Sequence, residues 1–264
     1  LSFVQVLRDE QAGVMDMNFP IDLAMTPDGR QMVVSSFGDN ALVLLNRNVN
    51  TGTLSFVQSF KNGSNGITDL AGAYALAISP DGQDIYLTAS DANSVLHFHR
   101  FPSSGLVVYE GVQKNGQNGV SGIAGTASLT VSPDGQYLYV AGTSEDALVL
   151  FERNPDNGQL HFLEKIENGS NGVTGLDFPV AISVSSNNKD IYVAGFGANA
   201  LVLFERSSTN GILNWAATEQ GLNQGVKGIM GAKALDFTQN GSHCYVAGEA
   251  SDALAVFERN STTG

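Results

Sequence analysis

The amino-acid sequence predicts an all-β protein, a five-bladed β-propeller with four antiparallel strands in each blade. The first observation is a 53-residue pattern that occurs five times, each copy holding four short apolar segments separated by turn residues. The second is composition. Charged residues make up only 15% of the 264 residues and glycine occurs 30 times, which is typical of strands joined by tight turns.

Residues that recur every 53 positions, without insertion or deletion, establish the repeat. The turn Pro-Asp-Gly places Gly29, Gly82 and Gly135 at this interval, and Asn188 and Gly241 occupy the next two steps. An arginine recurs in the same way, as Arg47, Arg100, Arg153, Arg206 and Arg259. Because five such repeats account for nearly the whole chain, we assign residues 1–264 to a single propeller domain.

The third repeat illustrates the four strands in order. Residues 127–132 (ASLTVS) form the first strand, and a Pro-Asp-Gly turn follows because glycine supplies the positive φ that such turns require. Residues 137–142 (YLYVAG) form the second strand and residues 147–153 (ALVLFER) the third. A second turn, NPDNG, leads to the fourth strand at residues 160–166 (LHFLEKI). Segments this short and rich in Val, Leu, Ile and aromatic residues have the length and composition of strands.

The two ends of the chain predict how the ring closes. Residues 1–7 (LSFVQVL) resemble residues 54–60 (LSFVQSF), which form the fourth strand of the first repeat. We therefore expect the N-terminal strand to pair into the last blade, which would leave no free edge between the first and last blades. A fragment of a longer array or of a seven-bladed ring is the alternative.

One face of the predicted propeller carries a repeated Asn-Gly loop, next to the turn between the second and third strands. Amide side chains both donate and accept hydrogen bonds, and glycine lets the backbone approach a ligand closely, so the loops are predicted to bind sugar hydroxyls. The predicted ligand-binding residues of the loops are Asn62, Asn65, Asn115, Asn118, Asn168, Asn171, Asn223 and Gln224. Those of the turns are Asn40, Asn93, Asp146, Asn199 and Asp252. The alternative is that these residues only shape the backbone of loops and turns.

The metal and arginine hypotheses rest on fewer residues. Asp22 and Asp236 fall in the first strands, nearest the axis of the propeller, and are candidate ligands of a cation such as calcium. Otherwise no cofactor is expected. The recurring arginines are predicted to pair with carbonyls or carboxylates of the outer strands rather than to form a docking surface.

The composition also limits the partners and the location. A formal net charge of −13 excludes nucleic acid as an expected partner, and no apolar run is long enough to insert into a membrane. The chain begins at Leu1 rather than Met, which indicates a processed segment, and the sequons at Asn62, Asn168, Asn240 and Asn260 favour a secreted or cell-surface protein. A glycan or an extracellular protein is the expected partner, and the oligomeric state is left open.

The third repeat, VSPDGQYLYVAGTSEDALVLFERNPDNGQL, resembles the repeat of lactonase-type β-propellers. This group includes bacterial 6-phosphogluconolactonase-like proteins and YVTN-type surface-protein repeats. The resemblance covers the whole chain, once per repeat, and implies the propeller fold. It also implies that a lactonase would use polar and charged residues, His and Arg among them, at the channel mouth. The best-known enzymes of the group have seven blades.

These observations favour a non-catalytic, multivalent recognition module, a lectin-like propeller that binds through the Asn-Gly loops. No nucleophile elbow, phosphate-binding loop or His-rich metal signature is present, and none of the four histidines recurs in the repeat. A lactonase-like hydrolase is one alternative, based on the family resemblance. A structural or protein-interaction domain of a secreted or surface protein is another.

Overall fold

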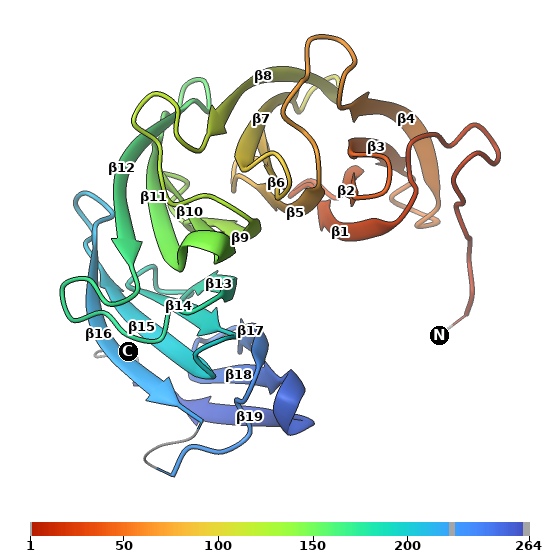
Figure 1. Cartoon of the computed structure of the whole chain (residues 1–264). Coiled ribbons are helices and arrows are strands. Elements are labelled where there is room, and N and C mark those ends of the chain that lie inside the picture. Colours follow the sequence, from red (N-terminus) through yellow and green to blue (C-terminus); the bar gives the residue numbers. More distant parts are fainter. Residues whose placement is uncertain (1, 222–224, 261–264) are drawn as a thin grey trace. The chain divides into compact units, whose positions relative to one another are not determined.

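Each of the five repeats folds into one antiparallel sheet whose strands follow chain order (Figure 1). The computed structural model describes residues 2–221 and 225–260. Within these residues, the first four sheets have four strands each and the fifth has three. The prediction of an all-β, propeller-like fold is therefore confirmed.

The strand bounds follow the predicted pattern closely. The first two sheets contain β1 (Pro20–Met25), β2 (Gln31–Ser36), β3 (Ala41–Arg47) and β4 (Leu54–Lys61), then β5 (Ala73–Ile78), β6 (Asp84–Ala89), β7 (Ser94–Phe101) and β8 (Leu106–Lys114). The third and fourth contain β9 (Thr126–Val131), β10 (Tyr137–Gly142), β11 (Ala147–Arg153) and β12 (Leu160–Glu167), then β13 (Pro179–Val184), β14 (Asp190–Gly195), β15 (Ala200–Arg206) and β16 (Leu213–Gln220). The fifth contains β17 (Ala232–Phe237), β18 (His243–Gly248) and β19 (Ala253–Glu258), and short 3-10 turns follow β10 (Thr143–Glu145) and β18 (Glu249–Ser251). The four strands expected in the third repeat coincide with β9 to β12 to within a residue.

The chain divides into two compact units, one of Leu1–Lys114 with Asp156–Gln159 and the other of Asn115–Pro155 with Leu160–Gly264. In the first unit β1 lies against β5, and in the second β13 lies against both β9 and β17. The first strands of consecutive repeats therefore lie side by side within each unit, as neighbouring propeller blades do. The assignment of residues 1–264 to one domain stays a prediction.

The core of each unit is built from the second and third strands of its repeats. Every residue of β6, β10 and β14 is buried. In the first unit, Leu42 and Leu44 of β3 share one apolar cluster with Ile85 and Leu87 of β6. Because these strands pack on both faces, they read in the sequence as continuous apolar runs rather than as alternating ones.

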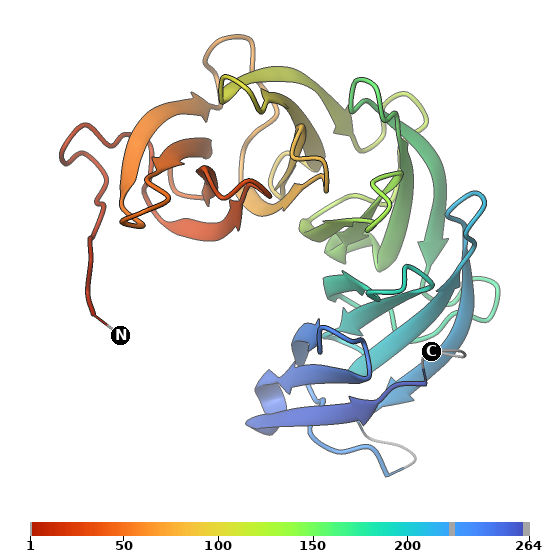
Figure 2. The same cartoon turned by 180° about the vertical axis from the view of Figure 1, so that it is seen from behind.

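The predicted pairing of the N-terminal strand with the last blade is not confirmed. Residues 2–19 contain no strand, and the last sheet consists of β17, β18 and β19 alone. The Gln5 side chain instead donates to the carbonyl of Leu54 at 2.9 Å and accepts from its amide at 2.7 Å, and Leu7 packs against the apolar cluster of the first repeat. Figure 2 shows this segment as an irregular trace that leads into β1. Residues 2–7, which resemble the fourth strand of the first repeat, thus form no strand among the described residues, and a closed five-bladed ring is not confirmed.

Candidate functional site

The Asn-Gly loops hold themselves together through the asparagines that were predicted to bind a ligand. In three loops, the side-chain oxygen of the leading asparagine accepts a hydrogen bond from the backbone amide eight residues later. These pairs are Asn62 with Leu70, Asn115 with Ile123 and Asn168 with Leu176, at 3.1 to 3.2 Å. The second asparagines, Asn65, Asn118 and Asn171, have a φ of 51 to 52°, a conformation that Asn tolerates better than most residues. Asn223 and Gln224 lie outside the described residues. Ligand binding by these side chains stays a prediction.

Three of the five predicted turn residues connect neighbouring sheets within a unit. All five have a φ between 49 and 54°: Asn40, Asn93, Asp146, Asn199 and Asp252. In three of them a side-chain oxygen accepts a backbone amide of the next repeat. These pairs are Asn40 with Gly72, Asp146 with Phe178 and Asn199 with Gly231, at 2.6 to 2.8 Å. The turn residues therefore serve the scaffold, and their binding of a ligand also stays a prediction.

Three of the five recurring arginines join consecutive sheets within a unit, and their predicted pairing with carbonyls and carboxylates is confirmed: Arg100, Arg206 and Arg259. Arg206 is representative. It donates to the turn carbonyl of Asn188 in its own repeat at 3.0 Å, and to Tyr139 Oη and Asp134 Oδ2 of the preceding repeat at 2.8 and 2.7 Å. Arg100 and Arg259 repeat this arrangement. The partners lie in turns and second strands, rather than in the outer strands that the sequence suggested.

These ion pairs change the acidity of the turn carboxylates. Burial raises the pKa of Asp28, but hydrogen bonds from Thr26 and from the Arg100 guanidinium outweigh it and lower the pKa to about 2. Burial also raises the pKa of Asp134. Hydrogen bonds outweigh this effect and lower the pKa to about 2; they come from Ser132, the backbone of Gln136, Asn188 and Arg206. Both carboxylates are therefore ionised at neutral pH.

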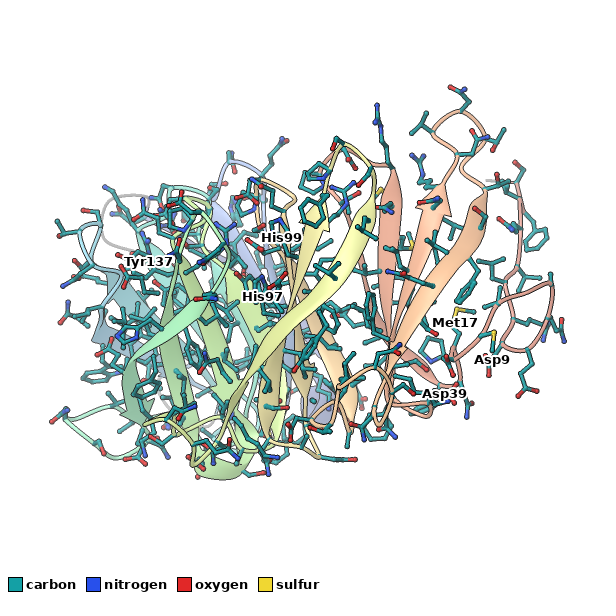
Figure 3. All side chains as sticks on the ribbon, turned by 90° about the horizontal axis from the view of Figure 1, so that it is seen from above. Asp9, Met17, Asp39, His97, His99 and Tyr137 are labelled. Atoms are coloured by element: carbon teal, nitrogen blue, oxygen red, sulfur yellow. The ribbon has the colours of Figure 1, made fainter. Side chains whose placement is uncertain are left out.

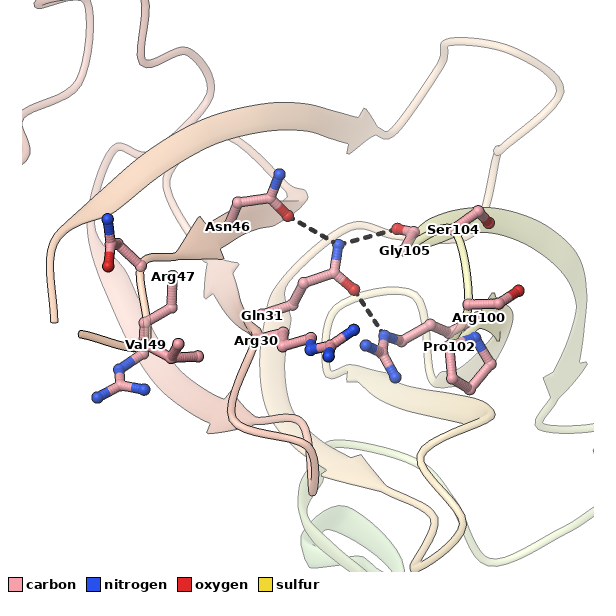
Figure 4. A pocket seen from close by; sticks show the side chains of 11 residues that line it. Arg30, Gln31, Asn46, Arg47, Val49, Arg100, Pro102, Ser104 and Gly105 are labelled. Carbon is pink, nitrogen blue, oxygen red and sulfur yellow. Dashed lines mark hydrogen bonds between the residues drawn. The ribbon is translucent and has the colours of Figure 1, made fainter. Parts of the chain in front are cut away.

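A polar cavity of about 440 Å³ lies in the first unit, where the ends of β2, β3 and β7 meet (Figure 4). Arg30, Arg47 and Arg100 line it, together with the amides Gln31 and Asn46. The chain contains seven arginines and has a formal net charge of −13, so a cavity lined by three of them is a local departure from that charge. Arg100 is paired with Asp28, and the positive charge that is not compensated comes from the other two arginines. Such a cavity is suited to an anionic ligand.

One wall of the cavity is fixed by a hydrogen-bond network around Gln31. Its amide nitrogen donates to Asn46 Oδ1 at 3.0 Å and to the Gly105 carbonyl at 2.8 Å, while its oxygen accepts from Arg100 Nε at 2.6 Å (Figure 4). Gln31 is buried, and Arg100 is only 1% exposed. These residues therefore form a rigid wall.

Two cations of the cavity remain able to bind a ligand. The guanidinium of Arg30 is exposed and makes no hydrogen bond or ion pair within the part of the chain that the structure describes. Arg47 is half-buried, and its one bond to another described residue runs from Nη1 to the Gly29 carbonyl at 3.1 Å. Its Nε and Nη2 remain as donors. Guanidinium groups bind phosphate and carboxylate through paired hydrogen bonds, so each of these side chains has donors suited to such a group.

The candidate metal residues of the sequence, Asp22 and Asp236, bond backbone amides in their own units. Asp22 accepts the amides of Leu23 and Leu76, and Asp236 accepts the amide of Phe237. Among the described residues, the group of His, Cys, Asp and Glu side chains with metal-ligand spacing consists of Asp84, His97 and His99. Binding of calcium by Asp22 or Asp236 stays a prediction.

Sequence reasoning missed the arginine cavity and the Asp-His-His group, although both leave a signal. Arg30 directly follows the first Pro-Asp-Gly turn, where the other repeats have Gln83, Gln136, Lys189 and Ser242. His97 interrupts the apolar third strand of the second repeat, where the other repeats have Leu44, Leu150, Leu203 and Val256. In both cases the informative feature is the residue that departs from the repeat.

Residues 58–173 and 165–264 match the family model described as "Lactonase, 7-bladed beta-propeller". The chain is 25% identical over 158 residues to 6-phosphogluconolactonase of Bacillus subtilis, covering 58% of this chain and 42% of that protein. It is 20% identical over 192 residues to 6-phosphogluconolactonase of Klebsiella pneumoniae, covering 73% and 55%. The solved periplasmic gluconolactonase of Pseudomonas aeruginosa superposes with a TM-score of 0.72 at 20% identity, covering 93% of this chain and 67% of that one.

The matches overturn two predictions from the sequence. The expectation of a non-catalytic, lectin-like module is wrong, and so is the expectation that the protein is not an enzyme, because the related proteins are named lactonases. The lactonase alternative is the one supported. The chain spans about half the length of these curated relatives, and the five sheets compare with seven blades in the family description.

The remaining expectations about partners and location are less constrained. No described helix is long and apolar enough to cross a membrane. Secretion, and binding of an extracellular partner, stay predictions.

The match of the family model over most of the sequence is decisive for identity: the chain belongs to the lactonase family of β-propellers.

Proposed function

We propose that this protein is a lactone hydrolase whose substrate is a phosphorylated sugar lactone such as 6-phosphogluconolactone. Family membership supports the reaction class, and the names of the two curated relatives support the substrate class. The observation that carries the proposal is the cavity lined by Arg30, Arg47 and Arg100 in a chain of strongly negative net charge. A cavity of about 440 Å³ falls in the size range of small-molecule sites.

The donors of the cavity match the chemistry of such a substrate. A phosphate group carries close to two negative charges at neutral pH, and Arg30 and Arg47 supply two guanidinium groups with uncommitted donors. The amide of Asn46 and the hydroxyl of Ser103 can bond the sugar hydroxyls.

The reaction needs stabilisation of developing negative charge. Water adds to the lactone carbonyl, the carbonyl oxygen becomes an oxyanion, and the ring C–O bond then breaks to give a hydroxy acid. Fixed cations and amide donors stabilise an oxyanion most effectively when their own contacts already hold them in place. The network of Gln31 and Arg100 provides that rigidity along one wall.

The test is steady-state hydrolysis of 6-phosphogluconolactone and of unphosphorylated gluconolactone by the wild type and by Arg30→Ala/Arg47→Ala. A hydrogen bond between charged groups contributes about 1.5–3 kcal/mol, so losing each arginine is expected to lower kcat/KM for the phosphorylated lactone about tenfold or more. Hydrolysis of the unphosphorylated lactone is expected to change much less. The control is Arg8→Ala, which removes an exposed arginine outside the cavity.

Three outcomes would each bear on the proposal. A selective loss with the phosphorylated lactone supports phosphate recognition by this cavity. Equal rates for the wild type and the double variant would place the substrate elsewhere. Equal losses in the double variant and in Arg8→Ala would reduce the effect to general charge and contradict the assignment.

A further inference from the structure

Asp84, His97 and His99 form a compact cluster on β6 and β7 of the first unit, separate from the residues that line the arginine cavity. Asp84 Oδ1 lies 2.8 Å from His97 Nε2 and 3.0 Å from His99 Nδ1. The three potential ligand atoms all lie within 4.8 Å of one another. The side chains of His97 and Asp84 are 6% and 1% exposed, and that of His99 is 18% exposed. His97 and His99 are labelled in Figure 3.

Strand geometry explains why these side chains meet. His97 and His99 are two residues apart on β7, so both point to the same face of the sheet. Asp84 is the register partner of His99 on β6, and Tyr86 is the partner of His97. The His97 ring stacks on Tyr86 with the ring centroids 5.2 Å apart, and the His99 ring meets Phe101 edge to face at 4.7 Å. Packing therefore fixes both imidazoles.

A loop of the same unit, residues 156–159, closes over the cluster. Tyr86 Oη donates to the Gly158 carbonyl at 2.6 Å. A methyl group on Gly158 would overlap Asp84 Oδ1 and His97 Nε2, so glycine is required where the backbone approaches the cluster this closely. The cluster is thus enclosed but remains partly open at His99.

The two histidines are a departure from the repeat rather than part of its scaffold. The positions aligned with His97 hold an aliphatic residue in every other repeat: Leu44, Leu150, Leu203 and Val256. The fourth repeat retains an aspartate, Asp190, at the position of Asp84, and there Arg259 pairs with it while Leu203 and Glu205 replace the histidines. A buried aspartate at this place in the fold therefore does not require two histidines.

We propose that Asp84, His97 and His99 bind a divalent metal ion, with Zn²⁺ as the preferred ion. Two imidazole nitrogens and one carboxylate oxygen are a donor set that zinc accepts, and they leave a fourth position open at the partly exposed side of His99. Ligands about 2.0–2.1 Å from a tetrahedral zinc ion lie about 3.3 Å apart, so the two distances from Asp84 Oδ1 to the histidine nitrogens, 2.8 and 3.0 Å, have to widen by only a few tenths of an ångström. Each imidazole would coordinate through the nitrogen that now faces Asp84 and carry its proton on the other nitrogen.

The test is isothermal titration calorimetry, in which zinc chloride is added to the purified full chain after treatment with a chelator. One zinc ion per chain is expected to bind. His97→Leu places at this position the residue that three other repeats have there, and it is expected to weaken zinc binding at least about tenfold, since even partners outside the coordination sphere are worth 10–100-fold. His161→Asn is the matched control, because His161 is an exposed histidine on β12, and it is expected to bind zinc as the wild type does.

Spectroscopy gives a second readout that does not depend on stability. Cobalt(II) in place of zinc is expected to show the intense visible absorption of a four-coordinate site in the wild type, and to lose it in His97→Leu and in Asp84→Asn. Circular dichroism shows whether each variant is folded. The proposal is overturned if the folded wild type binds no zinc, or if His97→Leu binds zinc and cobalt as the wild type does. It does not depend on lactone hydrolysis.

Discussion

The arginine that joins consecutive sheets should be one of the most important polar side chains for stability. Arg206 is fully buried and makes three hydrogen bonds, one of them to the carboxylate of Asp134, whose side chain is 25% exposed. Removing one partner of a buried ion pair costs about 3–5 kcal/mol. Because Asp134 can be partly rehydrated, the expected loss in the free energy of unfolding for Arg206→Ala is about 3 kcal/mol, the lower end of that range.

The control for this prediction lies in the first repeat. Arg47 occupies the aligned position but is half-buried and makes one hydrogen bond, to the Gly29 carbonyl. Arg47→Ala is therefore expected to cost only about 1 kcal/mol.

Urea unfolding measures both variants. Unfolding of the Arg206→Ala variant is monitored by the fluorescence of Trp215, which lies on β16 in the same unit as Arg206. Unfolding of the Arg47→Ala variant is monitored by circular dichroism. Combining Arg206→Ala with Asp134→Asn isolates the coupling between the two side chains. Equal losses for Arg206→Ala and Arg47→Ala, or a coupling near zero, would refute the assignment of the ion pair as a stabilising contact.

Two further predictions concern acid stability and the turn residues. The pKa of Asp134 in the folded protein, about 2, lies below the ordinary value of 3.8, so the hydrogen bonds that the carboxylate accepts from Ser132 and its other partners contribute stability above pH 4 that is lost as the pH falls toward 2. Asp134→Asn should flatten the dependence of the melting temperature on pH in this window, and an unchanged slope would contradict the prediction. Asn199→Ala removes the hydrogen bond to the Gly231 amide and places alanine at a φ of 54°, which together should cost about 2 kcal/mol. Asn65→Ala, at a φ of 52°, should lower the free energy of unfolding by about 1 kcal/mol, through backbone strain alone. If thermal unfolding gave the same loss for both variants, the hydrogen bond between Asn199 and Gly231 would not be a stabilising contact between the sheets.

Local patterns predicted the repeat architecture well because each strand is specified by its own sequence. The apolar runs of the third repeat gave β10 and β11 with correct bounds, since both strands are buried on both faces. The Asn-Gly loops were placed correctly as loops. The composition of these loops indicates ligand donors, whereas in the structure Asn62 and Asn168 accept hydrogen bonds from backbone amides eight residues away.

Contacts between distant residues could not be inferred in the same way. The N-terminal residues resemble a strand, but two hydrogen bonds between Gln5 and Leu54 hold them against the first repeat. The arginine cavity combines residues of two repeats, and although Arg30 departs from the aligned residues of the other repeats, the repeat pattern does not state which side chains it meets. The pairing of Asp84 with His99 depends on the register between β6 and β7, which a single sequence does not state.

The most direct test of the proposed function is the rate at which the wild-type chain hydrolyses 6-phosphogluconolactone. The rate is measured at constant pH by continuous titration of the acid that is released. The expected result is a rate that rises in proportion to protein concentration above the spontaneous rate and that inorganic phosphate inhibits competitively, because phosphate would occupy the site of Arg30 and Arg47. A rate equal to that of buffer alone, from folded protein at several concentrations, would contradict the assignment of this chain as a lactone hydrolase.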